Sequence, residues 1–214
     1  MQVIAAVALG LSLAVLSTAG RAGTINFEEL PHDTALEPTI ASQGYRLELA
    51  GDFALVLGNA NEGLQMSGNG TKRLVAFNSS TIILSRQGGG AFDLLRFDGG
   101  ESWTSLPHLW ATQLRVEGQL AGGGSIAQVF SLDLQKDILT GLQQFVLGDG
   151  FRDLLSVRFS GIGGNPEFTL DNLVVDAQAA NVDAPSSAWL AVAGLASLGA
   201  LRRRRRISSA AAAR

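Results

Sequence analysis

The chain has 214 residues, among them 26 glycines and no cysteine, and 16% of its residues are charged. This length suits one domain with accessory segments better than two full domains. The lack of cysteine excludes disulfides, a thiol nucleophile and any cysteine-based metal site.

The charge is distributed unevenly along the chain. Between Gly23 and Asp183 there are nine basic and nineteen acidic residues, a net charge of −10, although the whole chain carries only −3. Such an acidic domain repels a phosphate backbone, so nucleic acid is not an expected partner.

Residues 1–22 have the pattern of a signal peptide. Val3–Leu16 is an uncharged, mainly apolar run, and small residues follow it at two candidate cleavage positions, after Ala19 and after Ala22. A signal peptide predicts export across the inner membrane. The alternative is a buried N-terminal helix or strand, because no basic residue precedes the apolar run.

Residues 23–180 contain short segments in which apolar and polar residues alternate, which is typical of strands in a β-sandwich. The alternation is clearest in Gln113–Glu117, Phe130–Leu134 and Leu155–Ser160. Shorter compatible segments are Thr24–Leu30, Tyr45–Ala50, Phe53–Leu57, Arg73–Phe77, Thr81–Ser85 and Phe92–Phe97.

Four glycine clusters are expected to form turns between these strands, because glycine readily adopts positive φ. They are Gly88–Gly90, Gly99–Gly100, Gly122–Gly124 and Gly163–Gly164. The pattern as a whole predicts an all-β fold, a jelly-roll β-sandwich of about nine to eleven strands flanked by an N-terminal signal helix and a short C-terminal transmembrane helix.

Residues 181–206 predict a second targeting segment. Pro185 precedes an apolar stretch, residues 188–201, which is closed by Arg202, Arg203, Arg204, Arg205 and Arg206. As a helix the stretch is about 21 Å long, short of the roughly 30 Å hydrocarbon core, so it predicts a transient anchor. The arginines favour the cytoplasmic side, and residues 207–214 are expected to be a disordered cytoplasmic tail. A core helix with a solvated basic tail is the alternative.

This arrangement resembles the PEP-CTERM sorting signal of exported proteins in bacteria that make exopolysaccharide. The corresponding motif is Val182, Asp183, Ala184 and Pro185, in which the valine and the last proline match and Asp183 and Ala184 replace proline and glutamate. The resemblance implies removal of the tail by an exosortase, transient anchoring in the inner membrane, and a final place at the cell surface or outside the cell, in association with exopolysaccharide.

A second resemblance concerns the domain itself. Thr24–Glu28 and Phe168–Val175 look like the first and last strands of carbohydrate-binding jelly-roll modules. Such modules often hold a structural calcium with an early glutamate and a late aspartate, which implies calcium at Glu28 and Asp171. The residues alone show that Asp171 interrupts an apolar run and therefore needs a partner. A hydrogen bond to a neighbouring turn is the alternative to the metal.

Glycan binding by a jelly roll usually relies on exposed aromatic rings, and Trp103 and Trp110 are the candidates. Their alternative role is packing, since large rings are mostly buried. The two histidines, His32 and His108, lie far apart, and no nucleophile-elbow or zinc motif is present.

The sequence therefore predicts an exported, non-enzymatic surface or matrix protein associated with exopolysaccharide. A calcium-stabilised carbohydrate-binding module with a defined glycan ligand is the first alternative. A glycan hydrolase is the second, because the separation of two carboxylates depends on the fold.

Overall fold

The computed structural model describes residues 22–58, 66–135, 137 and 139–176. The predicted signal helix, the Val182–Pro185 motif, the apolar segment 188–201, the arginines 202–206 and the tail lie outside these residues. By its internal contacts the chain divides into Met1–Gln178 and Ala179–Arg214, and every described residue belongs to the first unit. Within the described part, no helix has the length and apolar character needed to cross a membrane.

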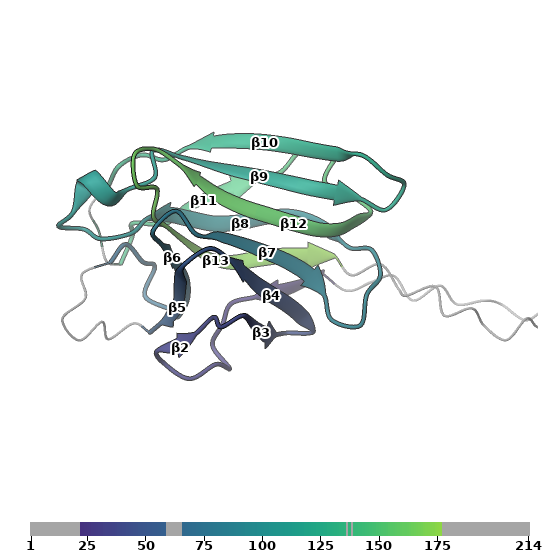
Figure 1. Cartoon of the computed structure of the whole chain (residues 1–214), viewed down its shortest axis with the longest axis horizontal. Coiled ribbons are helices and arrows are strands. Elements are labelled where there is room, and N and C mark those ends of the chain that lie inside the picture. The colour runs from purple at the N-terminus through teal and green to yellow at the C-terminus, as the bar shows by residue number, and fades with distance from the viewer. Residues whose placement is uncertain (1–21, 59–65, 136, 138, 177–214) are drawn as a thin grey trace, which may run out of the picture. The chain divides into compact units, whose positions relative to one another are not determined.

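Two antiparallel sheets make up the described domain (Figure 1), as predicted for a jelly-roll sandwich. The seven-stranded sheet contains β1 (Ala22–Ile25), β2 (Thr34–Ala35), β5 (Phe53–Leu57), β6 (Arg73–Phe77), β8 (Asp93–Glu101), β11 (Gln143–Val146) and β13 (Phe168–Asp176). The six-stranded sheet contains β3 (Thr39–Ser42), β4 (Tyr45–Ala50), β7 (Thr81–Arg86), β9 (Gln113–Leu120), β10 (Ser125–Ser131) and β12 (Leu154–Ile162).

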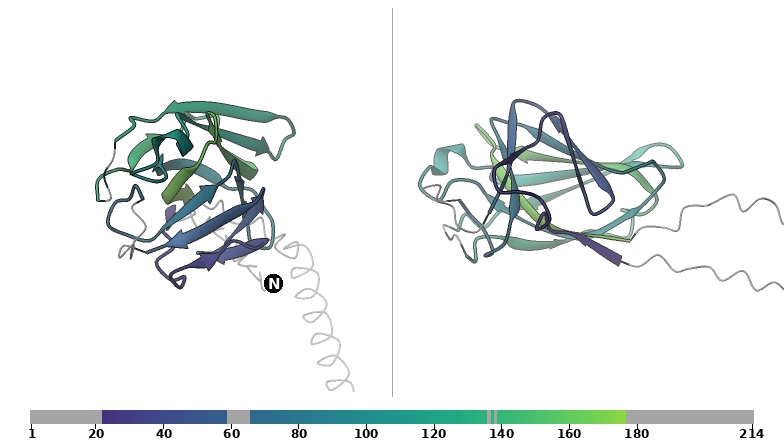
Figure 2. Two further views of the ribbon diagram at one scale, coloured as in Figure 1. Left: turned by 60° about the vertical axis from the view of Figure 1, so that its left-hand side comes forward. Right: turned by 90° about the horizontal axis from the view of Figure 1, so that it is seen from below.

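Some neighbouring strands are consecutive in the sequence, namely β3 and β4, β5 and β6, and β9 and β10, whereas the other neighbours are brought together by longer connections. The first sheet runs β11-β8-β13-β6-β5-β2, with β1 also on β13, and the second runs β10-β9-β12-β7-β4-β3. A short 3-10 helix, Pro107–Leu109, is the one helix of the described residues. The first and last strands, β1 and β13, lie side by side (Figure 2), because they pair from Ala22 opposite Asp176 to Ile25 opposite Leu173.

The core lies between the two sheets and is largely aromatic at its centre. Phe97 of β8 contacts the rings of Phe130, Phe145 and Phe159 at centroid distances of 5.6, 5.3 and 5.3 Å. These four rings come from both sheets, so their contacts join the layers. Buried aromatic pairs of this geometry each add about 0.5–1.5 kcal/mol beyond the area that they bury.

The structure has thirteen strands in its described residues, against about nine to eleven predicted. The difference lies in strands such as β2 and β3, which are two and four residues long and too short to show alternation. Two segments also differ in extent. β1 ends at Ile25, although the segment was expected to run to Leu30, and β10 ends at Ser131, so that Leu134, expected inside the strand, lies beyond it and is 47% exposed.

Gly99 and Gly100 were expected in a turn and instead lie within β8. Packing explains their presence there. A Cβ on Gly99 would lie 2.8 Å from Cδ1 of Leu114, and a Cβ on Gly100 would lie 2.6 Å from the carbonyl oxygen of Gly141. Glycine therefore permits close approach at this position, whereas the other three clusters contain glycines with positive φ, as predicted.

Gly100→Ala is expected to lower the free energy of unfolding by about 1–3 kcal/mol, because its new methyl group meets a backbone carbonyl that cannot rotate away. Gly122→Ala is the matched control, since a Cβ there meets nothing within 4 Å. Urea unfolding of the two variants checks this. Equal stability of the two would show that β8 is not closely packed at Gly100.

Candidate functional site

The last strand, β13, pairs with two different strands along one of its sides. Phe168–Leu170 pair with β6, and Leu173–Asp176 pair with β1, while β8 follows the opposite side. The sheet therefore forks at Asp171 and Asn172. The register between β13 and β8 shifts at this point, and Asn172 has a φ of 46°. This β-bulge turns neighbouring side chains in directions that a regular strand does not allow.

Asp171 lies at the fork and its side chain is fully buried. Its Oδ2 accepts hydrogen bonds from Asn69 Nδ2 at 2.8 Å and Thr71 Oγ1 at 2.7 Å, and its Oδ1 accepts one from the backbone N–H of Asn172 at 2.7 Å. Burial nevertheless raises the pKa of Asp171 to about 6, and the nearby charge of Asp98 acts in the same direction. Desolvation therefore outweighs three hydrogen bonds to the ionised form.

Arg73, the first residue of β6, is also fully buried. Burial lowers the pKa of its guanidinium, whereas the charge of Asp171 raises it. Arg73 also donates to backbone carbonyl groups, including Met66 O at 3.4 Å. The carboxylate and the guanidinium thus partly compensate each other's burial beside the fork.

Glu28 contacts the same loop, which contains Asn69, Thr71 and Lys72, from the other side. Its Oε1 accepts a hydrogen bond from the backbone N–H of Lys72 at 2.7 Å, and the ammonium of Lys72 donates to the carbonyl oxygens of Glu28 at 2.7 Å and Leu30 at 2.6 Å. The two predicted calcium ligands thus accept hydrogen bonds from adjacent residues of one loop: Asp171 from Thr71, and Glu28 from Lys72.

These contacts do not fit calcium well as they stand. Calcium needs six to eight oxygen ligands, yet three of the four carboxylate oxygens already accept hydrogen bonds from the chain, and an ammonium group occupies the carbonyls of Glu28 and Leu30. Among the described residues there is also no group of three or more acidic or histidine side chains placed so that they could hold a metal ion. Calcium binding at Glu28 and Asp171 stays a prediction.

Trp103 and Trp110 are brought together, but by packing. The indole N–H of Trp110 donates to the carbonyl oxygen of Trp103, and Trp110 is only 6% exposed. Trp103 is half-buried against Phe77, with ring centroids 6.1 Å apart. A glycan therefore reaches only Trp103 of this pair without a rearrangement, and the predicted ligand-binding role of the two residues stays a prediction.

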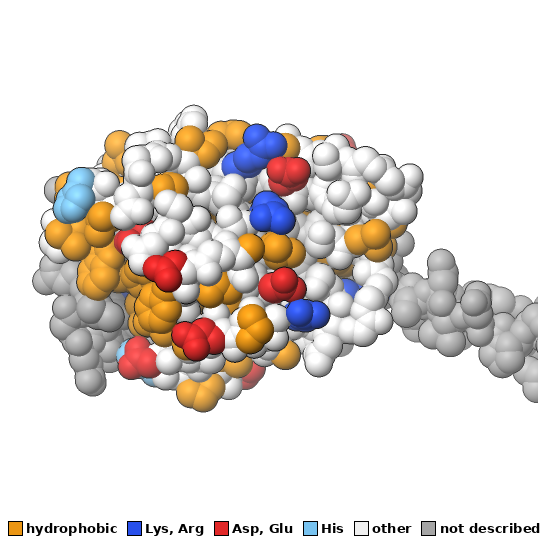
Figure 3. All heavy atoms as spheres, in the orientation of Figure 1, with side chains coloured by type: hydrophobic (Ala, Val, Ile, Leu, Met, Phe, Trp, Pro, Cys, Tyr) orange, Lys and Arg blue, Asp and Glu red, His pale blue; other side chains and the backbone are white. Residues whose placement is uncertain are grey.

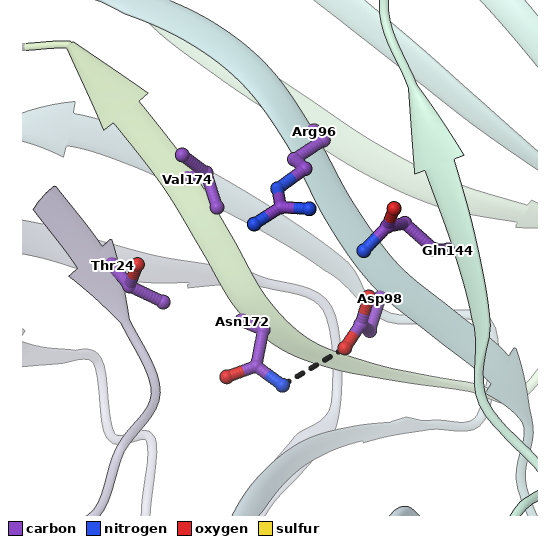
Figure 4. Close-up of a pocket in the computed structure, with 6 residues that line it drawn as sticks. All are labelled: Thr24, Arg96, Asp98, Gln144, Asn172 and Val174. Atoms are coloured by element: carbon purple, nitrogen blue, oxygen red, sulfur yellow. Dashed lines mark hydrogen bonds between the residues drawn. The ribbon is translucent and has the colours of Figure 1, made fainter. Parts of the chain in front are cut away.

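A groove of about 260 Å³ lies on the outer face of the seven-stranded sheet, beside the fork (Figure 4). Its lining comes from four strands: Thr24 from β1, Asn172 and Val174 from β13, Arg96 and Asp98 from β8, and Gln144 from β11. Strand register explains this grouping. Val174 lies opposite both Thr24 and Arg96, and Asp98 lies opposite Gln144, so these side chains form two rows across the sheet.

The groove is connected to the buried carboxylate by Asn172. Its side-chain amide donates to Asp98 Oδ2 at 2.8 Å inside the groove, while its backbone N–H donates to Asp171 below. Asp98 is therefore held in one orientation. In the part of the chain that the structure describes, neither Arg96 nor Gln144 has a side-chain hydrogen bond or ion pair, and both are exposed. Their polar atoms are available to a ligand.

Sequence reasoning missed this groove. Its residues span Thr24 to Val174, and only the pairing of β1, β13, β8 and β11 brings them together. The alternation in β8 gave one usable signal, because Arg96 and Asp98 flank the buried Phe97 and must therefore share the outer face.

Two further buried carboxylates lie at one end of the sandwich. Glu101 Oε1 accepts from the backbone N–H of Leu134 at 2.6 Å, and Glu167 Oε2 accepts from Ser102 Oγ at 3.1 Å. Burial raises the pKa of both carboxyl groups. With exposures of 0% and 3% they bind loops to strands and are closed to a polymeric substrate in this conformation.

No protein-family model matches the chain, and no curated protein matches it. Solved structures with a similar fold include a variant of the family 29 carbohydrate-binding module CBM29-2, with 11% identity, a TM-score of 0.44 and coverage of 73% of this chain and 91% of the module. Another is the K2 adhesin domain of Lys-gingipain, with 12% identity, a TM-score of 0.42 and coverage of 73% and 99%.

A third is CBM32-3 from a family 31 glycoside hydrolase of Clostridium perfringens, with 15% identity, a TM-score of 0.36 and coverage of 66% and 96%. All three TM-scores lie below 0.5. The functional proposal therefore depends on the groove itself.

The pKa of Asp171 leads to a prediction about stability. Because its folded-state pKa of about 6 lies above the ordinary value of 3.8, protonated Asp171 stabilises the fold below pH 3.8, and this contribution is lost as the pH rises through about 6. Asp171→Asn cannot ionise. The stability of the unaltered chain relative to this variant should thus fall by up to about 3 kcal/mol between pH 4 and 7.5.

Urea unfolding of both proteins across this range, in the presence of a chelator, measures the difference. A difference independent of pH would show that Asp171 does not titrate with a raised pKa. A gain in stability from added calcium in the unaltered chain, absent in the variant, would instead place the metal at this fork.

Proposed function

We propose that this protein is an exported, non-enzymatic protein of the cell surface or extracellular matrix, and that the groove on its seven-stranded sheet binds glycan. The observation that carries the proposal is the lining of the groove. Five of its six residues have polar side chains, and those of Arg96 and Gln144 have no partner among the described residues.

The chemistry of these side chains matches that of sugars. A sugar presents hydroxyl groups that both donate and accept, in pairs on adjacent carbons. Guanidinium and amide groups such as those of Arg96 and Gln144 make two parallel hydrogen bonds in one plane, and the carboxylate of Asp98 accepts from donors.

The charges of the groove favour a neutral glycan. Arg96 and Asp98 are its two charged residues, so the lining carries no net charge. The surrounding domain is strongly acidic, which disfavours polyanions. The six lining residues include no aromatic ring, so stacking does not contribute and the affinity per site is expected to be weak.

Arg96→Ala and Gln144→Ala should each weaken binding to neutral glycans by roughly tenfold, because each removes hydrogen bonds to the ligand worth about 1–2 kcal/mol. Arg158→Ala is the matched control, an exposed arginine on β12 of the other sheet. The measurement is retention on a glycan array that includes neutral and uronate-containing polysaccharides. Equal retention of all three variants would show that the groove is not the binding site. If the unaltered chain binds no glycan on the array, glycan binding itself is contradicted.

The proposed location follows from the two ends of the chain. The signal-like residues 1–22 and the PEP-CTERM-like residues 181–206 support export and transient anchoring, followed by removal of the tail by an exosortase and association with exopolysaccharide. The fold is compatible with removal of the signal peptide. Cleavage after Ala19 leaves β1 intact, and cleavage after Ala22 removes only its first residue.

Mass spectrometry of the protein recovered from its own host should find a mature chain that lacks Arg202–Arg206. The same chain expressed in a bacterium without an exosortase should keep these residues and stay with the inner membrane. Retention of the arginines in the native host would make the apolar segment a permanent anchor and would contradict sorting.

A further inference from the structure

The edges of the two sheets are not alike. The edge strands β2, β3 and β11, and β1 at the fork, have two to four residues each. β10 closes the six-stranded sheet with seven residues, and no strand of the described chain pairs with its outer side. Among the described residues, the longest sheet edge is therefore open.

The direction of the backbone groups of β10 follows from its pairing with β9. The N–H of Leu120 donates to Gly124 O, and the N–H of Leu132 donates to Thr112 O. Hydrogen-bonded pairs alternate along an antiparallel ladder, so Ile126, Gln128 and Phe130 direct their backbone groups to β9. Ser125, Ala127, Val129 and Ser131 then direct theirs to the open side, and their side chains are the exposed ones.

β10 also lacks the features by which proteins protect an edge. Lysine, proline, inward charges and bulges usually prevent pairing with another chain. The sequence Ser-Ile-Ala-Gln-Val-Phe-Ser has neither charge nor proline, and its register with β9 is continuous over all seven residues. Val129 adds an apolar side chain that is 46% exposed. Another extended strand can pair with all of its outward backbone groups at once.

We propose that β10 pairs with β10 of a second copy of this chain, in antiparallel orientation about a two-fold axis at Gln128. This register pairs all seven residues, with Ala127 opposite Val129 and Ser125 opposite Ser131. The outward backbone groups of each copy meet those of the other, so each satisfies its partner. The pairing joins two six-stranded sheets into one continuous sheet.

The charges beside β10 are compatible with a second copy as the occupant. On β9 the ion pair Arg115–Glu117 lies beside Val129 and Ala127, in register with them. In the two-fold arrangement, a row of neighbouring residues runs across the joined sheets from Arg115 and Val129 of one copy to Ala127 and Glu117 of the other. Figure 3 shows basic and acidic side chains side by side across this face. No like charges meet across the new strand pair, and an isologous contact of this kind closes at the dimer.

Val129→Lys tests the pairing, because it places two ammonium groups close to the two-fold axis. Leu155→Lys is the matched control: Leu155 lies on β12 of the same sheet and is also 46% exposed, but not at an edge. Sedimentation equilibrium of the whole chain in mild detergent should show a dimer for the unaltered protein and for Leu155→Lys, and loss of the dimer for Val129→Lys. A monomeric unaltered chain, or equal association of the two variants, would overturn the proposal.

A cross-link tests the register independently. The chain has no cysteine, so a single introduced cysteine reports one position only. In this register residue 128 of one chain lies opposite residue 128 of the other, in a non-hydrogen-bonded pair. The Cα atoms of such a pair are about 4.5 Å apart, which suits a disulfide. Gln128→Cys should form a covalent dimer under mild oxidation, whereas Leu155→Cys should not. Equal cross-linking of both variants would overturn the register.

Discussion

The burial of one carboxylate, that of Asp171, determines how the seven-stranded sheet is assembled. A carboxylate inside a protein has to be compensated by hydrogen bonds or by an opposite charge. Asn69, Thr71 and the backbone of Asn172 provide the hydrogen bonds, and Arg73 lies beside it. These contacts hold the loop that precedes β6 against β13 at the point where β1 takes over the pairing. The same bulge directs Asn172 into the groove, so the fork and the candidate binding surface depend on one constraint.

The sequence identified this constraint only in part. A charged residue among apolar ones marks a buried group that needs a partner, and on that ground Asp171 could be singled out. Its partners Asn69 and Thr71 precede it by about a hundred residues, in a segment with no periodic pattern, and nothing local indicates that they meet it. The groove was hidden for the same reason. Arg96 and Asp98 were visible as outward residues of one strand, but Gln144 and Thr24 join them only through the order of the strands.

Local patterns also leave the role of a residue open where packing decides it. Paired glycines usually indicate a turn, yet Gly99 and Gly100 continue β8 because Leu114 and Gly141 approach its backbone closely. Paired tryptophans in a loop suggested a sugar-binding surface, yet Trp110 is buried and donates its indole N–H to Trp103. In both cases the residue type predicts a range of roles. The choice among them depends on neighbours from other strands, which the sequence does not place.

The groove and the open edge lie on different sheets, so occupation of one leaves the other accessible. This separation has a consequence for binding strength. As a proposed glycan site without an aromatic ring, the groove is expected to bind weakly at a single site, but the proposed two-fold pair of chains would carry two grooves on one rigid body. When both engage the same repeating polymer, the second contact forms at a high effective concentration, and avidity exceeds the affinity of either site by about 10²–10⁴. With the proposed glycan binding, pairing through β10 would thus convert weak individual contacts into durable attachment, with no change in the groove itself.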